Sequence, residues 1–195
     1  MANLDYARRE IIYKLVYYGT GLGGKTTNLK FLYDKLAPDM KGEFVSVASS
    51  TERTLFFDFL PVDLGTYKDF KIRLALYTVP GQWEYNHSRK LILQQVDGIV
   101  FVADSSEERA EANRDSIDNM KENLEANNLK LEEIPWVLQY NKRDLADAMP
   151  VERMEKELNL AGVPSFASVA MDGTQVMTTF KALTARVVGG RMRVD

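Results

Sequence analysis

A glycine-rich segment near the N-terminus, Gly19-Thr20-Gly21-Leu22-Gly23-Gly24-Lys25-Thr26, constrains the fold of this chain more than any other feature. It matches the pattern G-x-x-x-x-G-K-[ST], in which glycines let the backbone wrap closely around a polyphosphate with its N–H groups turned inward. Ile11–Tyr18, just before it, is rich in β-branched and aromatic residues and predicts a strand, and Thr26–Leu36 carries apolar residues at helical spacing. A strand, a glycine-rich loop and a helix in this order predict a phosphate-binding loop at a helix N-terminus.

Two side chains of this loop carry specific expectations. Lys25 is expected to reach the β- and γ-phosphates of a nucleotide, and the Thr26 hydroxyl is expected to ligate Mg²⁺. The residues that we expect to contact the nucleotide here are Gly19, Gly21, Leu22, Gly23, Gly24, Lys25, Thr26 and Thr27. The alternative is a glycine-rich turn without a ligand, which the flanking strand and helix patterns disfavour.

The rest of the chain alternates strand-like and helix-like segments. Thr54–Leu64 and Phe70–Tyr77 predict an antiparallel hairpin around residues 65–69. Continuous apolar runs at Gly98–Ala103 and Pro135–Tyr140 predict buried parallel strands. Further patterns predict a strand at residues 165–169 and helices at residues 105–127, 151–158 and 175–188.

This order of elements predicts one α/β domain over residues 1–195, with a short flexible tail from about residue 189. The expected fold class is a P-loop fold with a mostly parallel, doubly wound sheet, one antiparallel edge strand, and helices on both faces. In such sheets the ligand binds at the C-terminal ends of the strands, where nearly all of the motifs fall.

Composition narrows the classes of function. The net charge of −3 gives no general attraction to nucleic acid or anionic lipid. The chain has no cysteine, which excludes disulfides, thiolate metal sites and cysteine nucleophiles. No apolar run reaches about 18 residues, Ala2 stands where myristoylation needs glycine, and prenylation would need a C-terminal cysteine. We therefore expect a cytoplasmic protein with no direct membrane anchor.

A second motif, Asn141-Lys142-Arg143-Asp144, follows the predicted strand at residues 135–140. The Asp144 carboxylate can accept two hydrogen bonds from the N1–H and N2–H₂ edge of guanine, an edge that adenine does not offer. Asn141 can bridge the purine and the phosphate loop, and the stem of Lys142 can lie over the base plane. These residues predict GTP or GDP as the bound nucleotide, whereas a plain surface turn is the alternative.

Taken in order, these motifs resemble those of the small Ras-like GTPases. The closer resemblance is to the bacterial MglA-type GTPases that set cell polarity and motility, and it covers roughly residues 8–188. The segments that carry it are Tyr17-Tyr18-Gly19, Gly24-Lys25-Thr26-Thr27-Asn28-Leu29, Glu52-Arg53-Thr54-Leu55-Phe56-Phe57-Asp58-Phe59-Leu60-Pro61, Tyr77-Thr78-Val79-Pro80-Gly81-Gln82, Ser88-Arg89-Lys90-Leu91-Ile92-Leu93, and Val96-Asp97-Gly98-Ile99-Val100-Phe101-Val102-Ala103-Asp104-Ser105.

The resemblance implies a role for several residues in hydrolysis. Thr54 would meet the γ-phosphate and Mg²⁺, which makes it a metal ligand together with Thr26. Gly81 would donate its N–H to the γ-phosphate, and Gln82 would orient the attacking water. Arg53 would be an arginine supplied in cis that neutralises charge in the transition state, so that the expected catalytic residues are Gln82 and Arg53.

The resemblance also implies a third contact to the base. Val169-Ala170-Met171 would support guanine through backbone N–H groups, which adds Ala170 and Met171 to the expected nucleotide contacts.

One position departs from the general GTPase pattern. Thr78 stands where an aspartate usually holds a Mg²⁺-bound water, and a neutral hydroxyl holds such a water more weakly. We therefore expect reduced magnesium affinity and slow intrinsic hydrolysis. The alternative is that Thr78 is only the last residue of a strand.

The resemblance implies a nucleotide-dependent switch, with switch I at about residues 38–54 and switch II at about residues 79–93. It implies that the strand beginning near Leu55 slides between nucleotide states. The implied partners are a roadblock-type, MglB-like regulator that accelerates hydrolysis, and polarity or motility effectors that could recruit the protein to a cell pole. We expect a monomer in the absence of these partners.

Three functions remain open from the sequence. The first is an active GTP hydrolase that acts as a polarity switch. The second is a GTP-bound adaptor that scarcely hydrolyses, as Thr78 suggests. The third is a P-loop ATPase or kinase, which the motif Asn141–Asp144 argues against.

Overall fold

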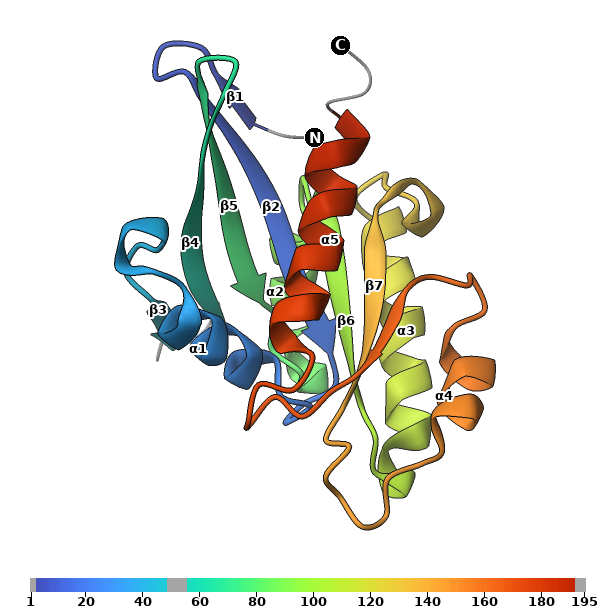
Figure 1. Cartoon of the computed structure of the whole chain (residues 1–195). Helices are drawn as coiled ribbons and strands as arrows, with labels where there is room; N and C mark the ends of the chain where they lie inside the picture. The colour runs from blue at the N-terminus through green and yellow to red at the C-terminus, as the bar shows by residue number, and fades with distance from the viewer. Residues whose placement is uncertain (1–2, 49–55, 192–195) are drawn as a thin grey trace.

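A single sheet forms the centre of the molecule. The computed structural model describes residues 3–48 and 56–191. The strand order is β3-β4-β5-β2-β6-β7-β8, and β1 pairs with the N-terminal part of β2 (Figure 1). The strands are β1 (Asn3–Asp5), β2 (Glu10–Gly19), β3 (Val45–Ala48), β4 (Phe56–Tyr67), β5 (Phe70–Thr78), β6 (Gly98–Asp104), β7 (Trp136–Asn141) and β8 (Ser165–Ala167).

Helices connect most of these strands. The α-helices are α1 (Lys25–Lys35), α2 (Asn86–Ile92), α3 (Ala110–Glu125), α4 (Val151–Leu158) and α5 (Val176–Arg191). Four short 3₁₀ helices complete the described elements: η1 (Pro38–Met40), η2 (Trp83–Tyr85), η3 (Glu107–Arg109) and η4 (Leu131–Glu133). Within residues 3–48 and 56–191, no helix is both long and apolar enough to cross a membrane.

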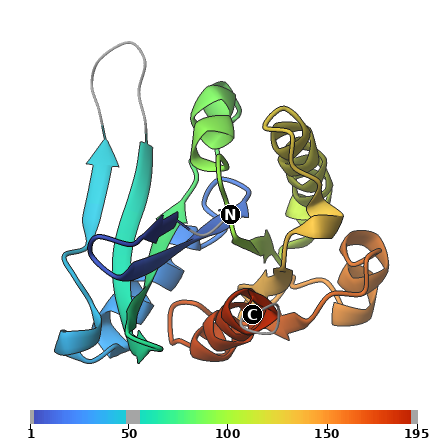
Figure 2. The same ribbon diagram turned by 90° about the horizontal axis from the view of Figure 1, so that it is seen from above.

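The helices cover both faces of the sheet, as the sequence predicted. Figure 2 shows α1 and α5 on one side of the sheet and α2 and α3 on the other. Because side chains alternate along a strand, neighbouring residues of β6 feed opposite cores. Ile99 and Phe101 pack in the core with α3 and α4, whereas Val100 and Val102 pack in the core with α1 and α5.

Strand directions match the predicted sheet with one correction. β2, β5, β6, β7 and β8 run parallel to one another, whereas β4 is antiparallel to β5 and β1 is antiparallel to β2. However, β4 is not the edge strand, because β3 pairs with it on its outer side. The sequence missed β3 because its four residues are too few to show a period.

The predicted hairpin is present, but its turn is tighter. Only Lys68 and Asp69 separate β4 from β5, and both have positive φ values, 44° and 66°. Two such residues form the turn type that suits the twist of a hairpin. Gly65, the first residue of the expected turn segment, has φ 90° and lies where the register shifts between Asp63 and Thr66. The glycine therefore serves a β-bulge rather than the turn.

We expect the packing of α5 against β6 to tolerate no added methyl group at Gly98. A Cβ there would lie 2.5 Å from Val187 Cγ2 and 3.1 Å from Leu15 Cδ2. Gly98→Ala should therefore lower the free energy of unfolding in urea by about 1–3 kcal/mol, the cost of overpacking a core. Gly189→Ala is the matched control. Gly189 lies in α5, and no atom lies within 4 Å of a Cβ built on it. This substitution should therefore raise the free energy of unfolding by about 0.5–1 kcal/mol. Equal effects of the two changes would contradict this packing.

Candidate functional site

The loop between β2 and α1 has the backbone conformation that its glycines predict. Gly24 precedes α1 with φ 101°, and a Cβ on it would lie 2.1 Å from the side-chain nitrogen of Asn141. Only glycine fits this position, since both the conformation and the space exclude a side chain. The N-terminus of α1 therefore opens directly into the loop, and its positive dipole end would favour an anion there.

Lys25 is buried at the start of this helix. Its Nζ donates hydrogen bonds to the carbonyl oxygens of Gly19 (3.0 Å) and Thr20 (2.6 Å). The pKa of the Lys25 ammonium is lowered to about 7, mainly by burial and also by the nearby guanidinium groups of Arg89 and Arg109, whereas the Asp58 carboxylate acts in the opposite direction. A cation held at this cost is stabilised by a ligand that carries several negative charges, such as a polyphosphate.

A cavity of about 440 Å³ opens in front of this loop. It is lined by residues 22–27 of the loop, by Ser46 and Val47 of β3, by Phe57 and Asp58 of β4, and by residues 78–81. Strands β3 and β4 thus form one wall of the site. Its position, at the C-terminal ends of β2 and β5, is the one predicted for the ligand.

Asp58 is the carboxylate of this cavity wall, and no role is predicted for it from the sequence. It accepts hydrogen bonds from the hydroxyls of Thr26 (2.6 Å), Thr78 (2.9 Å) and Ser46. Its own backbone N–H donates to Thr78 Oγ1 at 2.8 Å. The side chain is 8% exposed. No pattern in the sequence marks this residue, because its place depends on how β4 pairs with β5.

The second predicted motif lies beside the phosphate loop. Asn141 Nδ2 donates to the carbonyl of Gly23 at 2.8 Å, and Asn141 Oδ1 accepts from the backbone N–H of Ala170 at 2.8 Å. The Asn141 side chain therefore joins three loops, those after β2, β7 and β8. The bridge to the phosphate loop is the one that the sequence suggested.

The remaining residues of the base motif flank this bridge. Lys142 Nζ lies 2.6 Å from Asp104 Oδ2, a carboxylate buried at the end of β6. This ion pair fixes the lysine, so that its stem is held beside the loop. Asp144 and Met171 are exposed, and so is Leu22 of the phosphate loop.

The segment after β5 is packed against the phosphate loop. A Cβ on Gly81 would lie 2.2 Å from the backbone nitrogen of Gly21. Gln82 follows with an exposed side chain. In this arrangement Gly81 occupies space next to the loop, and a γ-phosphate that hydrogen-bonds to it would have to separate the two segments. Arg53 and Thr54 lie outside the described residues.

A buried polar network holds this segment in place, and the sequence did not predict it. The Arg89 guanidinium on α2 donates to the carbonyls of Pro80 (3.3 Å) and Gln82 (2.5 Å) and to Asn119 Oδ1 (2.9 Å). Asn119 also accepts from the Tyr18 hydroxyl at 2.7 Å. A signal was present in the sequence: the asparagines at positions 119 and 123 lie four residues apart and so share one face of α3.

Arg109 is a second cation that approaches the phosphate loop from outside. Its Nη2 donates to the carbonyl of Gly21 at 2.9 Å. Arg89 and Arg109 line a smaller cavity of about 130 Å³ together with Gly81. With Lys25, three cationic side chains therefore surround the loop, which favours an anionic ligand.

The donor set fits Mg²⁺ only if the nucleotide shares the coordination. Among the described residues, no group of three or more His, Cys, Asp or Glu side chains could hold a metal ion. Mg²⁺ prefers oxygen ligands, keeps several waters, and is usually bound through one or two protein ligands and substrate phosphates. The Thr26 hydroxyl and the Asp58 carboxylate at the phosphate loop match this requirement.

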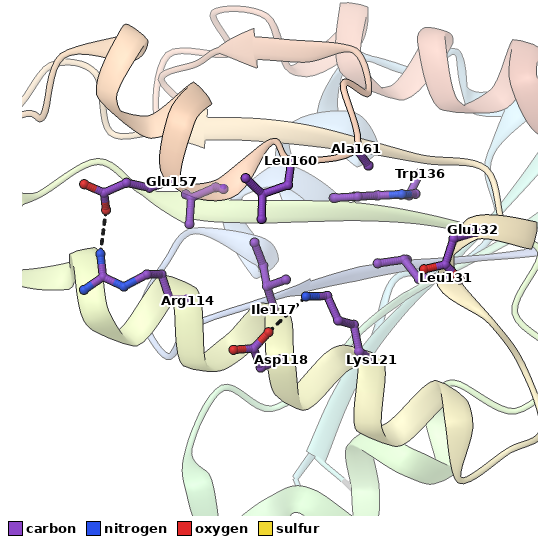
Figure 3. A pocket seen from close by; sticks show the side chains of 11 residues that line it. Arg114, Ile117, Asp118, Lys121, Leu131, Glu132, Trp136, Glu157, Leu160 and Ala161 are labelled. Carbon is purple, nitrogen blue, oxygen red and sulfur yellow. Dashed lines mark hydrogen bonds and ion pairs between the residues drawn. The ribbon is translucent and has the colours of Figure 1, made fainter.

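Another cavity, of about 430 Å³, lies away from the phosphate loop between α3 and α4 (Figure 3). Its apolar surface comes from Ile117, Trp136 and Leu160, among others. Both cations of its lining are paired, Arg114 with Glu157 at 2.5 Å and Lys121 with Asp118 at 3.0 Å, and Glu132 adds a further carboxylate. This cavity therefore lacks the cationic character of the phosphate site.

Comparison with known proteins agrees with this geometry. Residues 2–186 match the model of the ADP-ribosylation factor family. The chain is 52% identical over 188 residues to the mutual gliding-motility protein MglA of Myxococcus xanthus (strain DK1622), which covers 96% of each chain. It is also similar to the Ras-related protein Rab-27B of Rattus norvegicus, with 27% identity over 94% of this chain and 81% of that protein.

We expect the Arg89 network to contribute strongly to stability and to order in residues 80–82. Arg89→Ala leaves buried partners without their hydrogen bonds, so the free energy of unfolding should fall by about 2–3 kcal/mol. Amide hydrogen exchange at residues 81 and 82 should become faster. Arg114→Ala removes the same side chain from an exposed ion pair and should cost at most about 1 kcal/mol. Unchanged exchange at residues 81 and 82 would argue against the network.

Proposed function

The chain belongs to the ADP-ribosylation factor family and is an MglA-type small GTPase that binds guanine nucleotide and hydrolyses GTP, and from this premise we propose which residues perform each step. The observation that supports the proposal best is the side chain of Asn141. It joins the phosphate loop at Gly23 to the loop of Ala170 through two hydrogen bonds of 2.8 Å. A phosphate site and a base site joined by one buried side chain suit one ligand that spans both.

We propose that the base is read by Asp144, Asn141 and Lys142, with Ala170 and Met171 beside it. The Asp144 carboxylate accepts from N1–H and N2–H₂ of guanine. The ion pair of Lys142 with Asp104 keeps the lysine stem in position to cover the base. The exposure of Asp144 and Met171 leaves both accessible to a ligand that enters from solvent.

The phosphates belong in the loop of residues 19–27. Its backbone N–H groups and the Lys25 ammonium would hold them, and the phosphate charge would stabilise the ammonium form of Lys25. Thr26 and Thr54 are the proposed hydroxyl ligands of Mg²⁺. When bound, this ion neutralises charge on the β- and γ-phosphates.

Hydrolysis is in-line attack of water on the γ-phosphoryl group. Gln82 orients the water, Arg53 neutralises the charge that develops, and Gly81 donates its N–H to the γ-phosphate. Gly81 packs against Gly21, and the Gln82 side chain is exposed. The GTP complex therefore requires these residues to move, and the energy of that rearrangement contributes to slow intrinsic turnover.

As a switch, the protein would report its nucleotide state to partners. We propose that it regulates motility and cell polarity from the cytoplasm as a single G domain. A roadblock-type, MglB-like activator would accelerate hydrolysis, and polarity effectors would recruit the GTP form to a cell pole. This part of the proposal rests on the resemblance to MglA-type GTPases and on the 52% identity with the motility protein of M. xanthus.

Base specificity is tested first by extracting the nucleotide that co-purifies with the protein, which we expect to be GDP or GTP. Asp144→Asn should weaken GDP binding at least about 30-fold, because two hydrogen bonds to a charged acceptor are worth several kcal/mol. Asp147→Asn is the control, since this exposed carboxylate accepts only from Ser106 among the described contacts. Recovered adenine nucleotide, or displacement of GDP by equimolar ATP, would overturn the base assignment.

Turnover is tested by single-turnover GTP hydrolysis. Arg53→Ala and Gln82→Leu should each slow hydrolysis about 10-fold or more while GTP affinity changes little, because both groups act mainly in the transition state. Hydrolysis at the wild-type rate in either variant refutes its catalytic role. Wild-type protein that holds GTP without turnover, even with a roadblock-type activator, would instead support the GTP-bound adaptor.

A further inference from the structure

Thr78 stands at the end of β5, where GTPases usually carry an aspartate. The magnesium site of this GTPase therefore lacks the carboxylate expected at that position. A neutral hydroxyl cannot replace the charge. The structure places another carboxylate at this point, that of Asp58 on the neighbouring strand β4. A role for Asp58 in metal binding rests on the proposed binding of guanine nucleotide at the phosphate loop.

The hydrogen bonds around Asp58 fix its position relative to the phosphate loop. Asp58 Oδ2 accepts from Thr26 Oγ1 at 2.6 Å, and Thr26 is the first hydroxyl of α1 and the proposed metal ligand. The same oxygen accepts from Thr78 Oγ1 at 2.9 Å, while the Asp58 backbone N–H donates to Thr78 Oγ1 at 2.8 Å. Thr78 and Asp58 are therefore joined twice across the β4–β5 pair.

The direction of the Thr26 bond suits metal binding. Thr26 donates its only hydroxyl hydrogen to Asp58, so the lone pairs of its oxygen remain for a cation. A hydroxyl that ligates Mg²⁺ and donates to an adjacent carboxylate is oriented and made a better ligand, as outer partners of metal ligands generally do. Asp58 thus stands at hydrogen-bonding distance from the metal ligand itself.

The negative charge of the buried Asp58 carboxylate also favours a cation beside it. Asp58 is buried and lines the cavity in front of the phosphate loop. Its hydrogen-bond donors among the described side chains are the hydroxyls of Thr26, Ser46 and Thr78, all of them neutral. The Lys25 ammonium interacts favourably with this carboxylate, and a divalent cation at the phosphates would add the further positive charge that stabilises a buried carboxylate.

We propose that Asp58 supplies the carboxylate of the magnesium site in place of residue 78, and that Thr78 acts as a positioning residue that holds Asp58 against Thr26. The carboxylate would bind the ion directly or through one of its waters, the two modes by which Mg²⁺ uses protein carboxylates. In this protein the carboxylate would come from β4 rather than from β5, and it would bind the same cation.

The experiment measures metal affinity rather than turnover. Mn²⁺ replaces Mg²⁺ as the probe, and electron paramagnetic resonance gives the affinity of the protein–GDP complex for it. Asp58→Asn keeps the size of the side chain and removes its charge, and should weaken Mn²⁺ binding at least about 10-fold. GDP affinity in excess EDTA should change by less than about 3-fold, because without metal the carboxylate has no cation to hold.

Two further variants test whether the charge at the metal site, rather than a change in folding, accounts for the loss of Mn²⁺ affinity. Asp58→Asn combined with Thr78→Asp returns a carboxylate to the site from β5, and should recover Mn²⁺ affinity to within about 3-fold of wild type if charge is what counts. Asp63→Asn is the control on the same strand, where the carboxylate pairs with Lys71 at 2.7 Å outside the site. It should leave Mn²⁺ affinity unchanged.

Each outcome decides between the proposals. Unchanged Mn²⁺ affinity in Asp58→Asn overturns the inference, and so does a parallel loss of GDP affinity in EDTA, which would mark Asp58 as structural only. If Asp58→Asn does not fold, the double variant decides: folded protein with weak Mn²⁺ binding refutes the exchange of carboxylates. Wild-type protein that binds no GDP would refute the proposed nucleotide site itself.

Discussion

The buried side chain of Asn141 is the contact on which the rest of the site depends. Its amide donates to Gly23 and its carbonyl accepts from Ala170, so one side chain sets the spacing of the phosphate loop and the base loops. The contact requires glycine at position 24, where a Cβ would lie 2.1 Å from the Asn141 nitrogen. This hydrogen bond therefore joins two motifs that lie 118 positions apart in the sequence into a single structural unit.

Sequence reasoning predicted the parts of the site that are local. The loop of residues 19–26, its flanking strand and helix, and Asn141 all follow from short patterns whose chemistry is independent of the rest of the fold. Asp58 could not be found in this way. Its position follows from the pairing of Phe59 with Tyr77, and apolar residues on both faces of this strand leave the register open to more than one choice. Strand β3 was missed for lack of length.

The Arg89 network, on the other side of the site, likewise could not be predicted from short sequence patterns. Arg89 connects α2, α3 and the backbone of residues 80–82, and such a meeting of three segments is a property of the tertiary structure. It has a consequence for the switch. Gly81 lies against Gly21, so the network stabilises an arrangement in which the two segments touch. If Gly81 donates to the γ-phosphate as proposed, binding of that phosphate would have to part the two segments, which would couple the third phosphate to the position of Gln82.

The placement of the acidic group on β4 has a further effect on switching. A carboxylate at position 78 would lie at the end of β5, next to the phosphate loop. Its position would not depend on the register of β4. Asp58 instead belongs to the strand that joins switch I to the sheet, and a one-residue shift of β4 along β5 would turn its side chain to the opposite face. The metal and the register of β4 must then stabilise one another. A strand that slides between states would change metal affinity as it moves, and nucleotide with its metal would favour one register over the other.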